Sequence, residues 1–184
     1  MAGRTAAPAV DHRRGLSGML ALSAQAALWF LPVTLPVLLW VAWSDLRAMR
    51  IPNGCVMALV LIYAVLGPFV LPLADWGWGW AQLCAVLAIG FALNVAGALG
   101  AGDAKLAAAM APFIAAGDIA FFILFLAVVM LAALVTHRAV RAVSLLRGLA
   151  PHWTSWQRRD FPLGFALGPA LALYLGLAAA MGAG

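Results

Sequence analysis

Long apolar runs separated by short polar stretches dominate the pattern of this chain. A helix needs about 20 apolar residues to cross the hydrocarbon core of a bilayer. Five runs approach that length, and each predicts one membrane-spanning helix: residues 28–43, 54–73, 80–99, 119–136 and 161–181. The pattern therefore predicts an all-α polytopic membrane protein.

The stretch 104–117 is apolar but short. Only twelve residues separate Lys105 from Asp118, which is too few for a full crossing. We interpret the stretch as a short fourth span, with Asp103 and Lys105 at the membrane boundary. The chain is then a bundle of about six transmembrane helices with no soluble domain.

Basic residues between the predicted spans are concentrated on one side of the membrane. Arg47 and Arg50 follow the first span, and Lys105 follows the third. The fifth span is followed by five arginines: Arg138, Arg141, Arg147, Arg158 and Arg159. Cytoplasmic loops carry an excess of Lys and Arg, so these three loops predict the cytoplasmic side. The opposite loops hold only Asp75 and Asp118 as charged residues.

The N-terminal tail departs from this asymmetry, because Arg4, Arg13 and Arg14 precede the first span. Two interpretations stay open. Residues 1–26 are either a cleaved signal, with a basic start and a short apolar run, or a tail whose charge does not set the orientation because the other loops hold more basic residues. The expected membrane-embedded domain is 27–184.

Composition supports a membrane protein and excludes several other classes. The 184 residues are 66% hydrophobic and 9% charged, with a mean hydropathy of +1.04. A chain this short cannot bury so much apolar surface in water, which excludes an ordinary soluble enzyme and a disordered region. Loop topology explains the net charge of +5, so the expected partner is the lipid bilayer and not nucleic acid. Cys55 and Cys84 lack the spacing of a zinc site, and neither a metal nor a cofactor is expected.

The candidate chemistry lies in the aspartates, since all six acidic residues are Asp. Asp45 ends the first predicted span and Asp103 opens the fourth, so both are expected at the cytoplasmic boundary. Ionisable residues within a membrane are costly and mark functional sites. Each has a plain alternative, Asp103 as a helix N-cap and Asp45 as a boundary acid paired with Arg47 or Arg50. The other four aspartates are expected to be solvated loop acids: Asp11, Asp75, Asp118 and Asp160. Asp160 is also expected to cap a helix.

The helix ends predict different ionisation of the two boundary carboxyl groups. A carboxylate is disfavoured at a helix C-terminus and favoured at an N-terminus. If the side chains meet, they share one proton, and Asp45 is its expected holder. A carboxylate that activates water and an acid that polarises a carbonyl are what an aspartic protease needs. This chemistry also predicts a polar cavity that water can enter.

Two motifs accompany these aspartates. Asp45 is followed by the sequence RIPN at residues 50–53, and Asp103 ends the sequence GAGD at 100–103, which continues as AKL. Together they resemble the prepilin peptidase family of GxGD-type intramembrane aspartic proteases. The segment PLGFALG at 162–168 is similar to the Pro-aromatic-Gly segment of the family's last helix, although leucine replaces the aromatic residue. The resemblance covers roughly residues 40–168.

The resemblance implies that Asp45 and Asp103 are the catalytic pair of an aspartic endopeptidase in the bacterial inner membrane. Such enzymes remove the short basic leader of prepilins at the cytoplasmic face, and pilus assembly machinery is a further expected partner. Larger members also methylate the new amino terminus and carry a cytoplasmic insert with Cys-x-x-Cys pairs. This chain has neither insert nor pairs. It resembles the peptidase-only branch associated with Flp (tight adherence) pili, for which no methyltransferase activity is expected.

Six further residues of the two motifs are expected to support the site or to lie near the substrate: Arg50, Pro52, Asn53, Gly100, Gly102 and Lys105. The two glycines are expected to form a turn that directs Asp103 inward. Lys105 either extends to the headgroups or tunes the site. Gly164 and Gly168 predict a face for tight helix packing, and His137 is assigned to a basic segment at the membrane surface.

Two other functions stay open from the residues alone. A small ion- or proton-coupled transporter also explains costly carboxylates within a membrane. It does not explain the glycine turn and the RIPN motif. A catalytically inactive pilus-assembly subunit is the second alternative, and leader cleavage in a co-expression experiment separates both from a peptidase.

Overall fold

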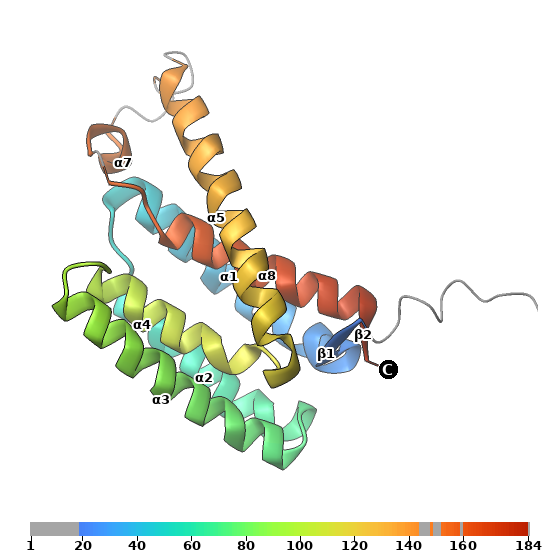
Figure 1. Ribbon diagram of the computed structural model, residues 1–184. Coiled ribbons are helices and arrows are strands. Elements are labelled where there is room, and N and C mark those ends of the chain that lie inside the picture. The colour runs from blue at the N-terminus through green and yellow to red at the C-terminus, as the bar shows by residue number, and fades with distance from the viewer. Residues whose placement is uncertain (1–18, 144–147, 149–151, 159, 184) are drawn as a thin grey trace, which may run out of the picture.

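The computed structural model describes residues 19–143, 148, 152–158 and 160–183 (Figure 1). Its long helices are α1 (Ala24–Ala48), α2 (Asn53–Val70), α3 (Leu73–Val95), α5 (Ile119–Ala142) and α8 (Gly164–Met181). The shorter elements are α4 (Ala101–Met110), α7 (Thr154–Gln157), the 3-10 turns η1 (Ala111–Phe113) and η2 (Ala116–Asp118), and the strands β1 (Leu20–Ser23) and β2 (Gly182–Ala183). Within the described ranges, five helices are long and apolar enough to cross a bilayer. The chain is an all-α polytopic membrane protein, as the apolar runs predict.

The helices differ in length from the apolar runs that predict them. α3 begins at Leu73 rather than at residue 80, because the chain turns at Pro72 and is helical from there. α5 continues to Ala142 rather than ending at 136. An apolar run marks the part of a helix that lies in lipid, whereas the helix itself continues into the polar boundary.

The predicted fourth span is a short helix followed by irregular chain. α4 has 10 residues and ends before Pro112, which lacks the N–H that would continue the helix. The six expected helices are therefore five long ones and one short one. The segment still leads from one end of the bundle to the other, since Gly102 packs against Ile51 while the N–H of Ala115 donates to the hydroxyl of Tyr174.

The two most closely packed helices are α1 and α8, which lie side by side through the centre of the structure (Figure 1). α1 buries a stripe of positions three or four apart, which include Phe30, Thr34, Leu38, Val41 and Asp45. This spacing is that of one helix face. A Cβ atom added at Gly168 of α8 would lie 2.8 Å from the Leu38 carbonyl oxygen, which confirms the tight packing expected at this glycine.

The remaining helices surround this pair unevenly. α2, α3 and α4 form a second group that contacts α1 through α2. α5 packs against α8 and then projects away from the α3–α4 pair (Figure 1). Only 6% of the most apolar 18-residue stretch of the α5 segment is buried, against 50% for the same length of α8. α5 therefore exposes most of its apolar surface to the bilayer or to a partner.

Asp118 is buried, so the prediction of a solvated loop acid is wrong for this residue. Its carboxylate accepts hydrogen bonds from the N–H of Ala21 at 2.8 Å, the N–H of Leu22 at 3.1 Å and the hydroxyl of Tyr174 at 2.7 Å. These bonds join η2 to α8 and to β1, which pairs in parallel with β2. All three donors are distant in sequence, which is why the local pattern does not indicate this role.

Replacing Asp118 with asparagine is expected to lower the free energy of unfolding by about 2 kcal/mol, because charge-assisted hydrogen bonds to buried donors are lost. Thermal unfolding in detergent measures the change. Asp75→Asn is the matched control, since Asp75 is exposed as predicted and its carboxylate accepts no hydrogen bond among the described residues. Equal melting temperatures for the two variants would contradict a structural role for Asp118.

His137 lies inside α5 and is buried, so its assignment to a surface segment is wrong. Its ring stacks on Trp156 with centroids 5.2 Å apart and meets the edge of Phe161 at 5.9 Å. Trp153 in turn contacts Trp43 of α1 at 5.5 Å. This aromatic cluster fixes the segment that precedes α8 against α1 and α5, and so helps to set where α8 begins.

Parts of the sequence interpretation concern residues that the structure does not describe. Asp11 and most of the predicted tail 1–26 lie outside the described residues, as do Arg147 and Arg159. The described part of that tail forms β1 and the first turn of α1. The signal interpretation and the boundary at residue 26 stay predictions.

Candidate active site

Asp45 is held at the buried end of the α1 stripe, where its side chain is 5% exposed. One carboxylate oxygen, Oδ2, accepts a hydrogen bond of 2.7 Å from the backbone N–H of Gly164. Gly164 is the first residue of α8, so the carboxylate lies at the N-terminus of that helix. The partial positive charge of the helix end stabilises a carboxylate there. Tertiary structure thus offsets the penalty expected for Asp45 at the C-terminus of α1.

Glycine is needed at position 164 because the carboxylate occupies the space of a side chain. A Cβ atom there would lie 3.0 Å from Asp45 Oδ2 and 3.2 Å from both Cβ and Cγ of Asp45. The sequence predicts only helix packing for Gly164 and does not indicate this contact with Asp45. A proline and a glycine at a helix start were visible in the sequence, but they did not identify the partner.

Asp103 lies in the first turn of α4 and is partly buried. The N-cap of this helix is Gly100, without a side-chain hydrogen bond, so Asp103 is not the N-cap. A Cβ atom at Gly100 would lie 2.5 Å from Asp103 Oδ2, so the glycine makes room for the side chain. A Cβ atom at Gly102 would lie 3.5 Å from the Ile51 Cβ, which is an ordinary van der Waals distance, so this contact does not require glycine.

The expected turn at Gly100 and Gly102 is displaced along the chain. Gly100 has a φ of −66°, which any residue adopts, and among the described glycines it is Gly97 that has a positive φ, at 74°. Gly100 makes room for a neighbouring side chain, and neither motif glycine has a left-handed backbone. Sequence alone does not separate these two uses of glycine, because both depend on the missing Cβ.

A polar cavity of about 380 Å³ contains both aspartates. Its lining residues are Asp45, Met49, Arg50, Ile51, Asn53, Gly100, Gly102, Asp103 and Lys105. We call it the aspartate cavity. It unites both predicted catalytic residues with five of the six predicted supporting residues. The sixth, Pro52, does not line it and instead starts α2, where its carbonyl oxygen accepts the N–H of Cys55 at 3.0 Å.

Met49 and Ile51 line the cavity but were not predicted. Met49 follows α1 in the left-handed region, with a φ of 51° and its N–H bonded to the Asp45 carbonyl oxygen at 2.9 Å. The Ser44 hydroxyl donates to the Arg50 carbonyl oxygen at 2.8 Å. These bonds fold the RIPN motif back beside Asp45. A strained backbone at a non-glycine residue is a signal found only in the structure.

The electrostatics of the cavity distinguish the two carboxyl groups. Asp103 lies outside the five spanning helices, and burial raises its pKa to about 6, with the charge of Asp45 acting in the same direction. No hydrogen-bond donor reaches its carboxyl group from the described residues, whereas Asp45 has the N–H of Gly164. Nor does any ion pair join Asp45 to Arg47 or Arg50 in this part of the chain. Burial acts on both carboxyl groups, so the hydrogen bond from Gly164 is the feature that favours ionisation of Asp45 over that of Asp103.

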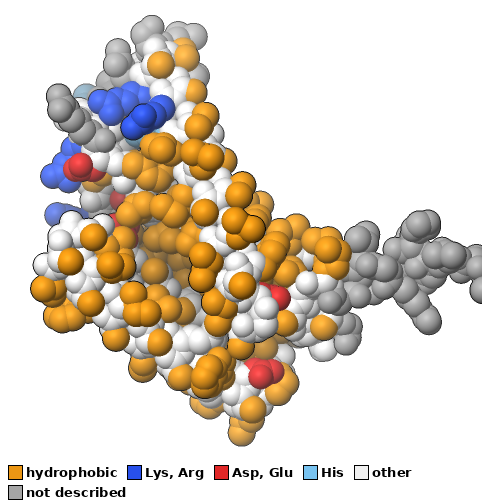
Figure 2. Space-filling model, viewed as in Figure 1, with side chains coloured by type: hydrophobic (Ala, Val, Ile, Leu, Met, Phe, Trp, Pro, Cys, Tyr) orange, Lys and Arg blue, Asp and Glu red, His pale blue; other side chains and the backbone are white. Residues whose placement is uncertain are grey.

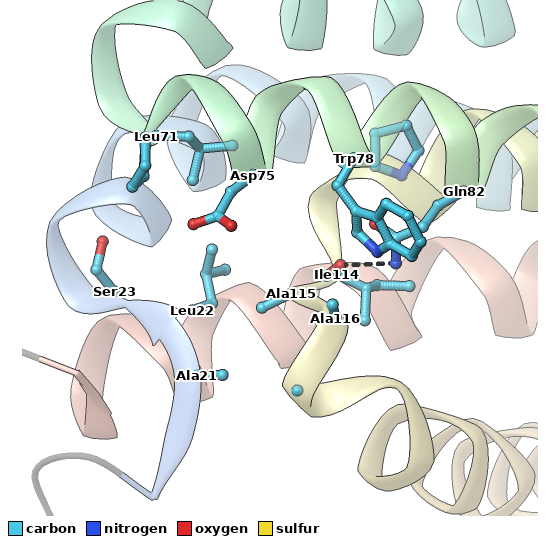
Figure 3. Close-up of a pocket in the computed structure, with 13 residues that line it drawn as sticks. Ala21, Leu22, Ser23, Leu71, Asp75, Trp78, Gln82, Ile114, Ala115 and Ala116 are labelled. Atoms are coloured by element: carbon cyan, nitrogen blue, oxygen red, sulfur yellow. Dashed lines mark hydrogen bonds between the residues drawn. The ribbon is translucent and has the colours of Figure 1, made fainter.

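The described residues contain no group of three or more His, Cys, Asp or Glu side chains placed to hold a metal ion. A metal-free and cofactor-free reaction stays a prediction. Another pocket, of about 260 Å³, lies at the opposite end of the bundle between β1, α3 and the segment from η1 to η2 (Figure 3). Figure 3 shows the Asp75 carboxyl group directed into it, and the Gln82 amide donating to the Ile114 carbonyl oxygen. It contains none of the predicted site residues.

Comparison with known proteins gives one match. The sequence model of the type IV leader peptidase family matches residues 32–136, which is more than half of the chain and includes both aspartates of the cavity. The comparisons with curated proteins and with solved structures gave no match.

Proposed function

Because this chain belongs to the type IV leader peptidase family, we propose that it cleaves the leader junction of a prepilin with Asp45 and Asp103 as the catalytic pair. The family makes it a membrane protease with an aspartic peptidase activity and a prepilin-type substrate. The observation that carries the residue assignment is the aspartate cavity, where carboxyl groups from α1 and α4 line one space.

The proposed reaction starts with Asp45 ionised and Asp103 protonated. Asp45 takes a proton from water, whose oxygen attacks the scissile carbonyl carbon, while Asp103 donates its proton to the carbonyl oxygen. The tetrahedral intermediate then breaks at the C–N bond. Asp45 gives its proton to the leaving amine, and Asp103 recovers its own from the collapsing hydroxyl. The assignment reverses the one expected from the helix ends, because the N-terminus of α8 lies beside Asp45.

We further propose the cytoplasmic face of the inner membrane as the place of cleavage. Arg50 and Lys105 line the aspartate cavity, and the positive-inside rule assigns such an end to the cytoplasm. Figure 2 shows Lys and Arg side chains gathered at one end of the visible face. The lack of an internal insert with Cys-x-x-Cys pairs supports a peptidase-only enzyme of Flp-type pili, acting beside pilus assembly machinery.

Co-expression with a candidate Flp prepilin tests this function. Leader removal, followed by the shift of the prepilin on a gel and by mass spectrometry of its new amino terminus, is expected only when the chain is present. An unmethylated terminus supports the peptidase-only proposal. A transporter or an inactive assembly subunit leaves every prepilin uncut.

Activity is expected to fall as the pH rises through the pKa of Asp103. That pKa is raised to about 6 in the free protein, so the acid that polarises the carbonyl is present below this pH and lost above it. The kcat/KM of the purified enzyme in detergent, measured against pH, should therefore show an alkaline limb at or above pH 6. A rate that increases steadily with pH across this range would contradict a protonated Asp103.

A further inference from the structure

A large apolar groove lies between α3, α4, α5 and α8, with a volume of about 550 Å³. Its lining includes Ala81 and Ala85 of α3, Ala107 and Met110 of α4, and Phe122 and Leu126 of α5. Figure 2 shows this hollow as a hydrophobic surface between α5 and the α3–α4 pair. We call it the apolar groove. Its alanine walls allow another helix to approach closely.

The near end of the apolar groove lies about one helical turn from the two aspartates, although the groove shares no lining residue with the aspartate cavity. Along α4, Ala107 and Met110 are one and two turns beyond Asp103 on the same helix face. Along α8, Leu167 lines the groove one turn beyond Gly164, whose N–H holds Asp45. A helix lying in the groove would therefore have one end about one helical turn from the aspartate cavity.

The lining of the apolar groove is less polar than that of a second groove nearby. The second groove, of about 460 Å³, lies between α2, α3 and α4 and includes Leu87 and Lys105. An apolar helix there would have to desolvate the Lys105 ammonium group, which is costly. In the apolar groove the polar side chain is Gln82, and its amide already donates to the Ile114 carbonyl oxygen at 3.2 Å.

We propose that the apolar groove binds the hydrophobic helix of the prepilin, with the leader junction at the aspartate cavity; this rests on the proposed function. The occupant is inferred from the position of the groove, which is apolar along its length and has its near end about one helical turn from Asp103 and Gly164. A substrate that enters the membrane directly after its cleavage site has the same sequence of polar and apolar parts. α5, which stands clear of α3 and α4, forms the outer wall.

Site-specific photo-cross-linking tests the occupant. A photoreactive phenylalanine replaces Ala85, Ala88 or Leu87 in an Asp103→Asn variant that keeps the prepilin uncut. Ala88 is exposed on α3 like Ala85 but lines neither groove. Cross-links to the prepilin from position 85 and not from 88 are expected. Cross-links only to lipid from position 85, or to the prepilin only from position 87, overturn the proposal.

Filling the groove gives a kinetic test. Ala85→Trp is expected to raise the KM for the full prepilin by about 10-fold, since a lost apolar contact acts on binding and not on the chemical step. Ala88→Trp should leave it unchanged. Both should cleave a short soluble junction peptide at the wild-type rate, which shows that the active site is intact. If Ala85→Trp cleaves the full prepilin with wild-type kinetics, the proposal that the prepilin helix binds in the groove is wrong. If the wild type cleaves no substrate, the proposed function is wrong instead.

Discussion

Asp45→Asn and Asp103→Asn are each expected to lower the kcat/KM for leader cleavage by at least about 10³-fold, because an amide neither takes a proton from water nor supplies one to the carbonyl oxygen. The size of the effect follows from the proposed roles. Without Asp45 there is no base beside the attacking water, and without Asp103 no acid lies beside the carbonyl. Rates are measured by quantifying cut and uncut prepilin over time with purified enzyme in detergent.

The design must separate loss of chemistry from loss of structure. Asparagine at position 45 keeps an oxygen that accepts the Gly164 N–H, so the start of α8 is expected to stay in place. Asp75→Asn and Asp160→Asn are matched controls, since both side chains are exposed and lie outside the aspartate cavity. Full processing by either catalytic-pair variant would rule out the proposed mechanism.

Gly164→Ala is expected to lower kcat by about 100-fold, because displacement of a catalytic group by about 1 Å has an effect of that size. The added Cβ would stand 3.0 Å from Asp45 Oδ2, and the nearby atoms belong to a buried side chain with little freedom to shift. Either Asp45 moves or α8 does, and both changes lengthen the bond that holds the carboxylate. The free energy of unfolding should fall by about 1–3 kcal/mol, as for other overpacked sites.

Gly176→Ala is the matched control in the same helix. A Cβ atom at Gly176 meets nothing within 4 Å, so this variant is expected to be as active as the wild type and slightly more stable. Cleavage rates and melting temperatures of both variants are compared in the same detergent. Unchanged kcat in a folded Gly164→Ala protein would show that the contact with Asp45 does not position the base.

Some features of the fold and the candidate site follow from local pattern. A run of apolar residues has one stable outcome in lipid, a helix that satisfies its own backbone, and so the five long helices were predictable. The two motifs could likewise be assigned to one site from their helix ends. The helix limits at Leu73, Ala142 and Gly164 were not predictable, because proline and the polar boundary decide them rather than hydropathy.

Other features depend on contacts between distant segments. Asp118 and Asp75 both stand in short polar stretches, yet one is buried among three donors and the other is exposed. His137 has the sequence context of a surface residue next to arginines, but in the structure the Trp156 ring of α7 stacks on it. No local pattern distinguishes these cases.

The sequence by itself determined that this protein is a helical membrane protein with two aspartates in recognisable motifs, because hydropathy and residue chemistry are properties of the chain. Only the tertiary structure decided that the N-terminus of α8 lies against Asp45, that Gly97 and not Gly100 has the left-handed backbone, and that an apolar groove lies between α3, α4, α5 and α8. Each of these depends on how separate helices pack, and packing is determined by shape complementarity among residues far apart in the chain.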